Sequence, residues 1–206
     1  GKKKKNMILD SLDALNKKKI ILASGSPRRK DILQNQLGLN VSVIPSKFEE
    51  PAPSSSSDPI TYVKDMSAGK AAEVASRVSD FDLIISADTM VCTQDSILGK
   101  PKSPSSALST LRLLSSLGSH FVRTGVTLLT PSSSVSFVVT TKVRFRSSIP
   151  DSELSAYVSS GDPMDKAGSY GIQSLGGVFI ESIDGCFFNV VGFPLHRFCL
   201  ELSKLN

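Results

Sequence analysis

The sequence predicts an α/β fold in which an elongated, mixed β-sheet is flanked by helices. Strand-like apolar segments alternate with helix-like segments along the 206 residues, and two long strand-like segments at 119–130 and 135–146 then follow as a hairpin. Hydrophobic residues make up 40% of the chain and charged residues 21%, which is typical of a globular protein. This length suits one domain or two tightly joined lobes.

The first half of the chain predicts a βα unit followed by a longer helix. Residues 20–23 form an apolar strand, and Ser26 and Pro27 are a typical helix cap and first helical residue. That helix is expected to run to Gly38, a natural stop. The other segments expected here are a short helix at 8–18, a strand at 41–45, a flexible loop at 51–58, a helix at 59–78 and a buried strand at 82–91.

The second half predicts helices at 103–117 and 151–159 around the long hairpin. Residues 178–183 and 186–191 are apolar and flank Asp184 and Gly185, a common hairpin turn pair, so we expect two further strands. Pro194 opens a final helix that ends near Leu205. We divide the chain into an N-terminal extension, 1–18, and a domain, 19–206.

Charge and cysteine content narrow the class of protein. The net charge is +5, but the lysine run at 2–5 supplies four of the positive charges and the rest is close to neutral. A stable nucleic-acid partner is therefore not expected. No apolar run approaches the ~20 residues of a membrane span, and no secretory leader is apparent. Three cysteines without metal-site spacing indicate reduced thiols and a cytoplasmic location.

A strand that runs into a capped helix predicts an anion site near its turn. Ser24, Gly25 and Ser26 occupy this turn, and Arg28 and Arg29 follow on the first helical turn. Free backbone N–H groups and the positive end of the helix dipole favour phosphate here. The ordinary alternative is a capped helix with surface arginines.

Three charged residues point to a second part of the same site. Asp88 interrupts an apolar strand beside Thr89, and a buried acid needs a partner, water or a metal. Lys70 shares a helix face with Met66 and Val74, although such a lysine commonly reaches solvent. Lys100 follows the Asp88 strand in a turn.

A Walker A phosphate loop at 64–71 is excluded. Lys64 stands where its first glycine is needed, and Ala71 stands where it requires Ser or Thr.

The segment 161–173 is rich in glycine, proline and charge, which predicts a long, structured loop. Gln173 offers both a donor and an acceptor and could contact the edge of a nucleobase. Four glycines from 168 to 177 indicate a close backbone approach. The ordinary alternative is a tight connection between a helix and a strand.

Taken in order, these segments resemble one known family. The matching motifs are Leu22-Ala23-Ser24-Gly25-Ser26-Pro27-Arg28-Arg29, Ala87-Asp88-Thr89, Gly99-Lys100-Pro101, Arg123-Thr124-Gly125-Val126, Asp165-Lys166-Ala167-Gly168-Ser169-Tyr170-Gly171-Ile172-Gln173 and Val190-Val191-Gly192-Phe193-Pro194-Leu195. They resemble the Maf, or septum-formation-inhibitor-like, nucleotide pyrophosphatases over about residues 19–205. The resemblance implies an inosine triphosphatase-like fold with two lobes around a central cleft. It also implies hydrolysis of nucleoside triphosphates to monophosphate and pyrophosphate, and a possible homodimer.

The resemblance also implies roles for individual residues. Asp88 would be the general base, and Glu50, or its neighbour Glu49, would help Asp88 hold Mg²⁺ or Mn²⁺. The residues implied to hold the phosphates are Ser24, Arg29, Lys70 and Lys100.

Three positions resemble those that distinguish substrate branches of the family, and Arg28, Thr89 and Gln173 all match the dTTP/UTP branch. CTP and modified pyrimidine nucleotides are further candidate substrates. Ser86 departs from the family's usual glycine, and Gly99 departs from the branch's frequent glutamate. The alternative function is a non-catalytic, nucleotide-binding regulator of cell division.

Overall fold

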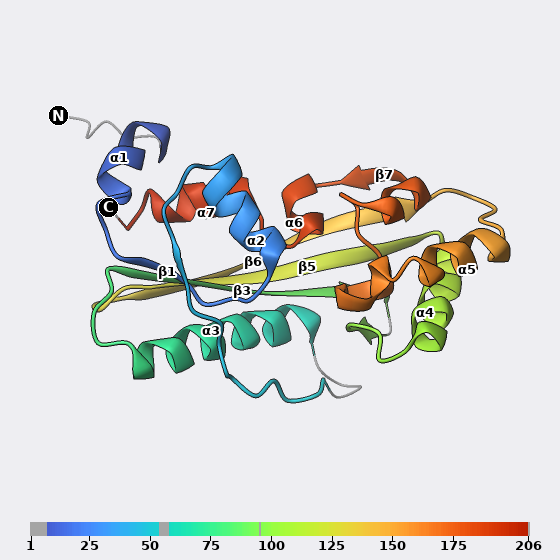
Figure 1. The fold of residues 1–206 in the computed structure, drawn as a ribbon, viewed down its shortest axis with the longest axis horizontal. Helices are drawn as coiled ribbons and strands as arrows, with labels where there is room; N and C mark the ends of the chain where they lie inside the picture. Colours follow the sequence, from blue (N-terminus) through green and yellow to red (C-terminus); the bar gives the residue numbers. More distant parts are fainter. Residues whose placement is uncertain (1–7, 54–57, 95, 206) are drawn as a thin grey trace.

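The computed structural model describes residues 8–53, 58–94 and 96–205. These form one seven-stranded mixed sheet in the order β2-β1-β3-β5-β6-β7, with β4 paired to β3 (Figure 1). The strands are β1 (Ile20–Leu22), β2 (Ser42–Val43), β3 (Leu83–Cys92), β4 (Ile97–Leu98), β5 (Ser119–Leu129), β6 (Ser134–Phe145) and β7 (Ile180–Asp184). The predicted α/β class and mixed sheet are confirmed.

The three long strands β3, β5 and β6 run the length of the molecule (Figure 1). β1 pairs in parallel with β2 and β3, whereas the ladders from β3 through β5 and β6 to β7 are antiparallel. β3 is a central strand of the sheet and is buried along nearly all of its ten residues. Its one carboxylate, Asp88, is therefore buried within the sheet.

Helices cover both faces of the sheet. α3 lies along one face, and α1, α2, α6 and α7 lie on the opposite side, while α4 and α5 pack at the far end (Figure 1). The helices are α1 (Leu12–Leu15), α2 (Pro27–Asp31), α3 (Pro59–Arg77), α4 (Pro104–Leu117), α5 (Asp151–Ser159), α6 (Phe187–Val191) and α7 (Leu195–Leu202). Within the described ranges, no helix combines the length and the apolar character needed to cross a membrane.

Two large hydrophobic clusters divide the molecule into two lobes. One contains Leu22 and Phe198 with residues of α1 and α7, and the other contains Leu111 and Phe145 with residues of α4 and α5. Because β3 and β5 contribute to both clusters, the lobes share one sheet. The space between the lobes is where the candidate site lies.

The helix start at Ser26 is confirmed. The Ser26 hydroxyl accepts the Arg29 backbone N–H at 3.5 Å, and Pro27 is the first helical residue. After Asp31 the coil widens into a π-helical turn, Ile32–Gln36, and Gly38 then ends it with φ of +76°. That φ favours glycine.

The predicted strand at 186–191 is wrong. Residues Phe187–Val191 form α6, so Asp184 and Gly185 do not join two strands. Thr141 Oγ1 on β6 accepts the Cys186 N–H at 3.0 Å and donates to the Cys186 carbonyl at 3.1 Å. The Asn189 amide is buried and donates to the Val122 carbonyl at 3.0 Å. These bonds tie the segment to β5 and β6, where it forms a helix in place of a further strand.

Other boundaries differ by a few residues. The first helix is shorter than predicted, a 3₁₀ turn at Ile8–Ser11 followed by α1, and β2 has two residues. β7 starts at Ile180 because Leu175–Phe179 is a 3₁₀ helix. The predicted loop at 51–58 lies partly outside the described residues, at 54–57.

Candidate active site

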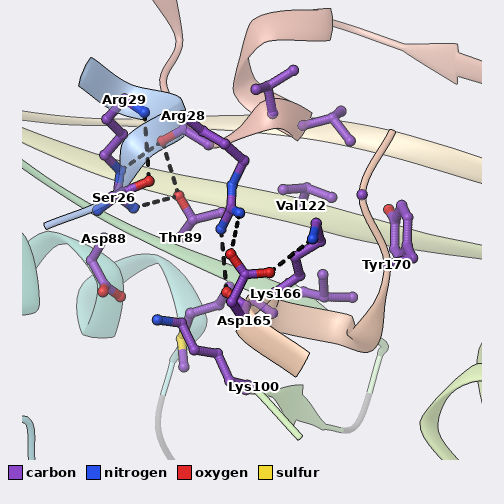
Figure 2. Close-up of a pocket in the computed structure, with 18 of the residues that line it drawn as sticks. Ser26, Arg28, Arg29, Asp88, Thr89, Lys100, Val122, Asp165, Lys166 and Tyr170 are labelled. Carbon is purple, nitrogen blue, oxygen red and sulfur yellow. Dashed lines mark hydrogen bonds and ion pairs between the residues drawn. The ribbon is translucent and has the colours of Figure 1, made fainter. Parts of the chain in front are cut away.

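A cavity of about 380 Å³ lies between the two lobes, and we call it the central pocket. Eight of the nine side chains predicted for the site line it: Arg28, Arg29, Glu50, Lys70, Asp88, Thr89, Lys100 and Gln173. Figure 2 labels five of these eight, Arg28, Arg29, Asp88, Thr89 and Lys100. The eight come from α2, α3, β3 and three connecting segments. Residues up to 145 positions apart in the sequence therefore meet in one pocket.

Lys70 lies between two carboxylates on the pocket floor. Its Nζ is 2.6 Å from Asp88 Oδ1 and 2.7 Å from Glu50 Oε1. The Lys70 and Asp88 side chains are only 13% and 10% exposed, so water screens this contact weakly. Lys70 therefore does not reach past the helix to solvent, as a lysine on an apolar helix face commonly does.

The packing of α3 on the sheet determines where Lys70 lies. Val63, Met66 and Val74 are buried on the face of α3 that meets β3 and β5. The Ser86 hydroxyl donates to the Ser67 carbonyl at 2.6 Å. Ser86, the departure from the family's usual glycine, is thus accommodated by a buried hydrogen bond to the helix that carries Lys70.

The donor set around Lys70 fits a divalent cation. Glu50 and Asp88 direct carboxylate oxygens at one point, where the Lys70 ammonium now supplies the positive charge. Mg²⁺ prefers oxygen ligands and is commonly held by one or two carboxylates together with substrate phosphates. The described residues contain no group of three or more His, Cys, Asp or Glu side chains placed to hold a metal. The protein thus supplies two carboxylates at this point.

Arg29 is fixed by three contacts. Its Nε donates to the Gly192 carbonyl, its Nη1 to Ser24 Oγ and its Nη2 to Thr89 Oγ1, each at 3.0 Å. Burial lowers the pKa of Arg29, while the negative charge of Asp88 opposes this shift. The guanidinium is held rigidly against the pocket, as an anion-binding group needs to be.

Ser24 and Thr89 both accept hydrogen bonds from the Arg29 guanidinium. Ser24 is buried behind the arginine and does not line the pocket, whereas the neighbouring Ser26 does. Thr89 lines the pocket, but its hydroxyl accepts from Arg29 and also lies 2.9 Å from Thr124 Oγ1. Both hydroxyls therefore orient the guanidinium.

Arg28 crosses the pocket to the opposite lobe. Its Nη1 donates to Asp165 Oδ2 at 2.6 Å and its Nη2 to the Asp165 carbonyl at 3.2 Å (Figure 2). Lys166, which also lines the pocket, donates to Asp165 Oδ1 at 2.8 Å. Burial acts to raise the pKa of Asp165, but the bonds from Lys166 and Arg28 outweigh it and lower that pKa to about 2.

Sequence reasoning did not assign Asp165, Lys166 or Tyr170 to the site. All three line the pocket, and all three lie in the charged, glycine-rich segment at 161–173. That composition was the available signal. Tyr170 is itself held by His120, whose Nε2 lies 2.7 Å from the Tyr170 hydroxyl oxygen.

The glycines of this region serve the packing of the segment itself. Gly168 has φ of +70°, and a Cβ there would lie 2.5 Å from Val91 Cγ2 on β3. A Cβ at Gly176 would lie 2.8 Å from the Gly171 backbone nitrogen. The close approach predicted from these glycines is made to other parts of the protein.

Known proteins resemble the chain in sequence over nearly its whole length. A family model described as "Maf-like protein" matches residues 19–205. A human protein named "Probable bifunctional dTTP/UTP pyrophosphatase/methyltransferase protein" is 45% identical over an alignment of 202 positions that covers 91% of this chain. The chain spans about a third (32%) of the length of that relative.

A Clostridium perfringens protein named "dTTP/UTP pyrophosphatase" is 43% identical over 192 residues, covering 91% of this chain and 97% of the relative. A solved nucleoside-triphosphatase, titled dITP/XTP pyrophosphatase, from Mycobacterium abscessus superposes with a TM-score of 0.45 and 14% identity. It covers 91% of this chain and 98% of its own.

Proposed function

This chain belongs to the Maf-like protein family, and on that premise we propose that it hydrolyses dTTP and UTP to the monophosphate and pyrophosphate. The observation that carries the proposal is the Glu50–Lys70–Asp88 group on the floor of a pocket whose wall holds the rigid Arg29. Cations that offset phosphate charge and a carboxylate beside the reacting phosphorus are what phosphoanhydride hydrolysis needs.

The pocket residues have two kinds of role: some bind the negatively charged phosphates, and one accepts a proton. We assign Arg29, Lys70 and Lys100 to the triphosphate oxygens, with Ser24 and Thr89 holding Arg29. Asp88 acts as general base: it takes a proton from a water whose oxygen attacks the α-phosphorus. The bond from the α-phosphorus to the bridging oxygen breaks, and pyrophosphate leaves with that oxygen.

Glu50 and Asp88 are the residues that would hold Mg²⁺ or Mn²⁺. When bound there, the cation would offset charge on the phosphates. The present bond from Lys70 to Asp88 shields the carboxylate that must accept the proton. A triphosphate gives Lys70 a competing partner, which frees an Asp88 oxygen for its role as base.

We assign nucleobase selection to Arg28 and Gln173. Arg28 and Gln173 line the central pocket from two different lobes, and both can donate hydrogen bonds to pyrimidine carbonyl oxygens.

CTP and modified pyrimidine nucleotides are further expected substrates, and removal of non-standard nucleotides is the expected role. We place the activity in the cytoplasm because all three cysteines are free thiols. A homodimer, and the lack of stable nucleic-acid binding, remain predictions.

The proposal is tested by pyrophosphate release from dTTP, UTP, CTP, GTP and ATP with Mg²⁺ or Mn²⁺. Wild type should release pyrophosphate most rapidly from dTTP and UTP. Asp88→Asn removes the base and should lower kcat by about 10²-fold or more while nucleotide binding, measured by calorimetry, persists.

Asp151→Asn is the matched control. Asp151 pairs with Arg112 on the exposed surface of α4 and α5, away from the pocket, and this variant should keep the wild-type rate. Release by Asp88→Asn at the wild-type rate would remove Asp88 from the role of base. Nucleotide binding without release by the wild type would favour the alternative, a non-catalytic regulator.

A further inference from the structure

Asp162 is a half-buried carboxylate that does not line the central pocket. Its side chain is 20% exposed, and it accepts hydrogen bonds from three side chains. Tyr157 Oη and Ser174 Oγ donate to Oδ2 at 2.6 and 2.7 Å, and Lys166 Nζ lies 3.2 Å from Oδ1. Burial acts to raise the pKa of Asp162, but these hydrogen bonds outweigh it and lower that pKa. We call these four residues the Asp162 network.

One arm of the Asp162 network holds the chain on both sides of Gln173, through the Gly171 backbone and the Ser174 side chain. Before Gln173, the Gly171 N–H donates to Tyr157 Oη at 3.3 Å, and this hydroxyl donates to Asp162. After Gln173, the Ser174 hydroxyl donates directly to Asp162. Only Ile172 and Gln173 lie between Gly171 and Ser174, the two residues that the network holds. The position of Gln173 in the pocket wall thus depends on the Asp162 carboxylate.

The other arm reaches Arg28. Lys166 is 9% exposed and donates both to the Asp162 carbonyl and to Asp165 Oδ1. Asp165 in turn accepts two bonds from the Arg28 guanidinium, one at its carboxylate and one at its carbonyl (Figure 2). A continuous chain of charged contacts therefore joins Asp162 to the arginine of the opposite lobe.

We infer that Asp162 is a positioning residue that fixes the relative placement of Arg28 and Gln173 and thereby sets nucleobase selectivity. This inference rests on the proposed function, which assigns both side chains to the nucleobase. The groups assigned to phosphate and proton transfer lie on α2, α3, β3, the segment around Glu50 and the turn that carries Lys100. None of the hydrogen bonds of the Asp162 network is made to Glu50, Lys70, Asp88 or Lys100. Loss of Asp162 should therefore change selection and leave the chemical step in place.

The test is kcat/KM for UTP and for GTP in wild type and Asp162→Asn. An amide has one acceptor oxygen in place of two, so it cannot accept the bonds from Tyr157 and Ser174 and pair with Lys166 at the same time. Either the anchor of the segment that carries Gln173 or the link to Arg28 is therefore lost. Misplacement of a contact group by about 1 Å can cost ~10²-fold. We expect the ratio of kcat/KM for UTP over GTP to fall about tenfold, through a higher KM for UTP, with kcat within about threefold of wild type.

Two further variants keep the test decisive. Ser174→Ala removes one bond to Asp162 with little change in volume, so it should fold and show a smaller loss of selectivity in the same direction. Asp151→Asn, an exposed aspartate on α5 in the same lobe, should keep the wild-type ratio. If Asp162→Asn fails to fold, Ser174→Ala decides the question.

The possible outcomes separate the inference from the proposed function. A wild type that prefers UTP, with variants whose UTP and GTP rates fall by one common factor, would show that Asp162 only supports the fold, and the inference would be overturned. A wild type that releases no pyrophosphate from UTP would overturn the proposed function, and the inference with it.

Discussion

The Lys70 ammonium lies where a divalent cation would have to bind. Glu50 and Asp88 both direct an oxygen at it, at 2.7 and 2.6 Å, and a cation placed on these oxygens would meet a like charge at close range. Two unit charges 4 Å apart interact by about 4 kcal/mol near a protein surface. Metal binding therefore requires Lys70 to move, and a triphosphate offers its ammonium another partner.

This geometry predicts that Lys70→Gln binds Mn²⁺ more tightly than wild type in the absence of nucleotide. The change removes the competing charge and leaves both carboxylates, so the dissociation constant should fall by about tenfold or more. Electron paramagnetic resonance of free Mn²⁺ measures this without any turnover. The same variant should hydrolyse UTP poorly, because a phosphate contact is lost.

Lys100→Gln is the matched control for Mn²⁺ binding. Lys100 also lines the pocket, but its side chain is exposed and is not the cation that bridges Glu50 and Asp88. It should change the Mn²⁺ affinity much less than Lys70→Gln does. Equal effects of the two variants would mean that only the total charge of the pocket matters.

At the level of residues, the sequence predicts charges better than it predicts their partners. An acid within an apolar strand and a lysine on an apolar helix face were detectable, because burying either charge alone is costly. The contacts of Ser24 with Arg29 and of Arg28 with Asp165 were not detectable. Arg28 and Asp165 lie 137 positions apart, and only the folded sheet brings them together.

At the level of elements, the contact of α3 with β5 sets the distance between Lys70 and Asp88. Gly125 on β5 lies directly opposite Asp88 in the β3–β5 ladder. A Cβ at Gly125 would lie 2.2 Å from the Val63 carbonyl oxygen of α3. The helix backbone thus rests against the strand at a position where no side chain intervenes.

Gly125→Ala is expected to push α3 away from the sheet. The clash is with backbone atoms that cannot rotate aside, so the free energy of unfolding should fall by about 1–3 kcal/mol. UTP hydrolysis should fall as well, because Lys70 moves with α3. Urea denaturation measures the stability change.

Gly99→Ala is the stability control for this prediction. A Cβ at Gly99 has no neighbour within 4 Å and its φ is not positive, so the free energy of unfolding should stay within about 0.5 kcal/mol of wild type. A Gly125→Ala protein as stable as wild type would show that α3 can shift freely on β5.

The predicted elements fail where tertiary contacts outweigh local pattern. Residues 186–191 are apolar and follow a turn signal, yet they form α6 because Thr141 and Asn189 tie that segment to β5 and β6. In contrast, the start of α2 and both ends of α3 and β3 were predicted to within about two residues, because caps, prolines and long apolar runs mark them locally. The elements that position the site were therefore the predictable ones.

At the level of the whole molecule, the lobe of α4 and α5 contains a buried histidine. His120 is 1% exposed, and its ring packs edge-on against Phe145, with centroids 5.0 Å apart. Among the described residues, no hydrogen-bond partner meets its Nδ1. Burial lowers the pKa of His120 to about 4, so the ring stays neutral in the folded protein at physiological pH.

His120 should make the stability of the whole protein fall between about pH 6.5 and pH 4. An unfolded histidine takes up a proton near its ordinary pKa of about 6.5, whereas the folded one does so only near 4, so the unfolded state binds more protons throughout this interval. The stabilisation is complete above pH 6.5, and about 3 kcal/mol of it is lost by pH 4. Glu73 and Asp165, with pKa values lowered to about 2, lose their stabilisation only below about pH 4.5.

Urea denaturation from pH 4.5 to 7.5 should show the free energy of unfolding falling with pH in wild type, and a flatter profile in His120→Gln. Equal slopes would assign the pH dependence to other groups.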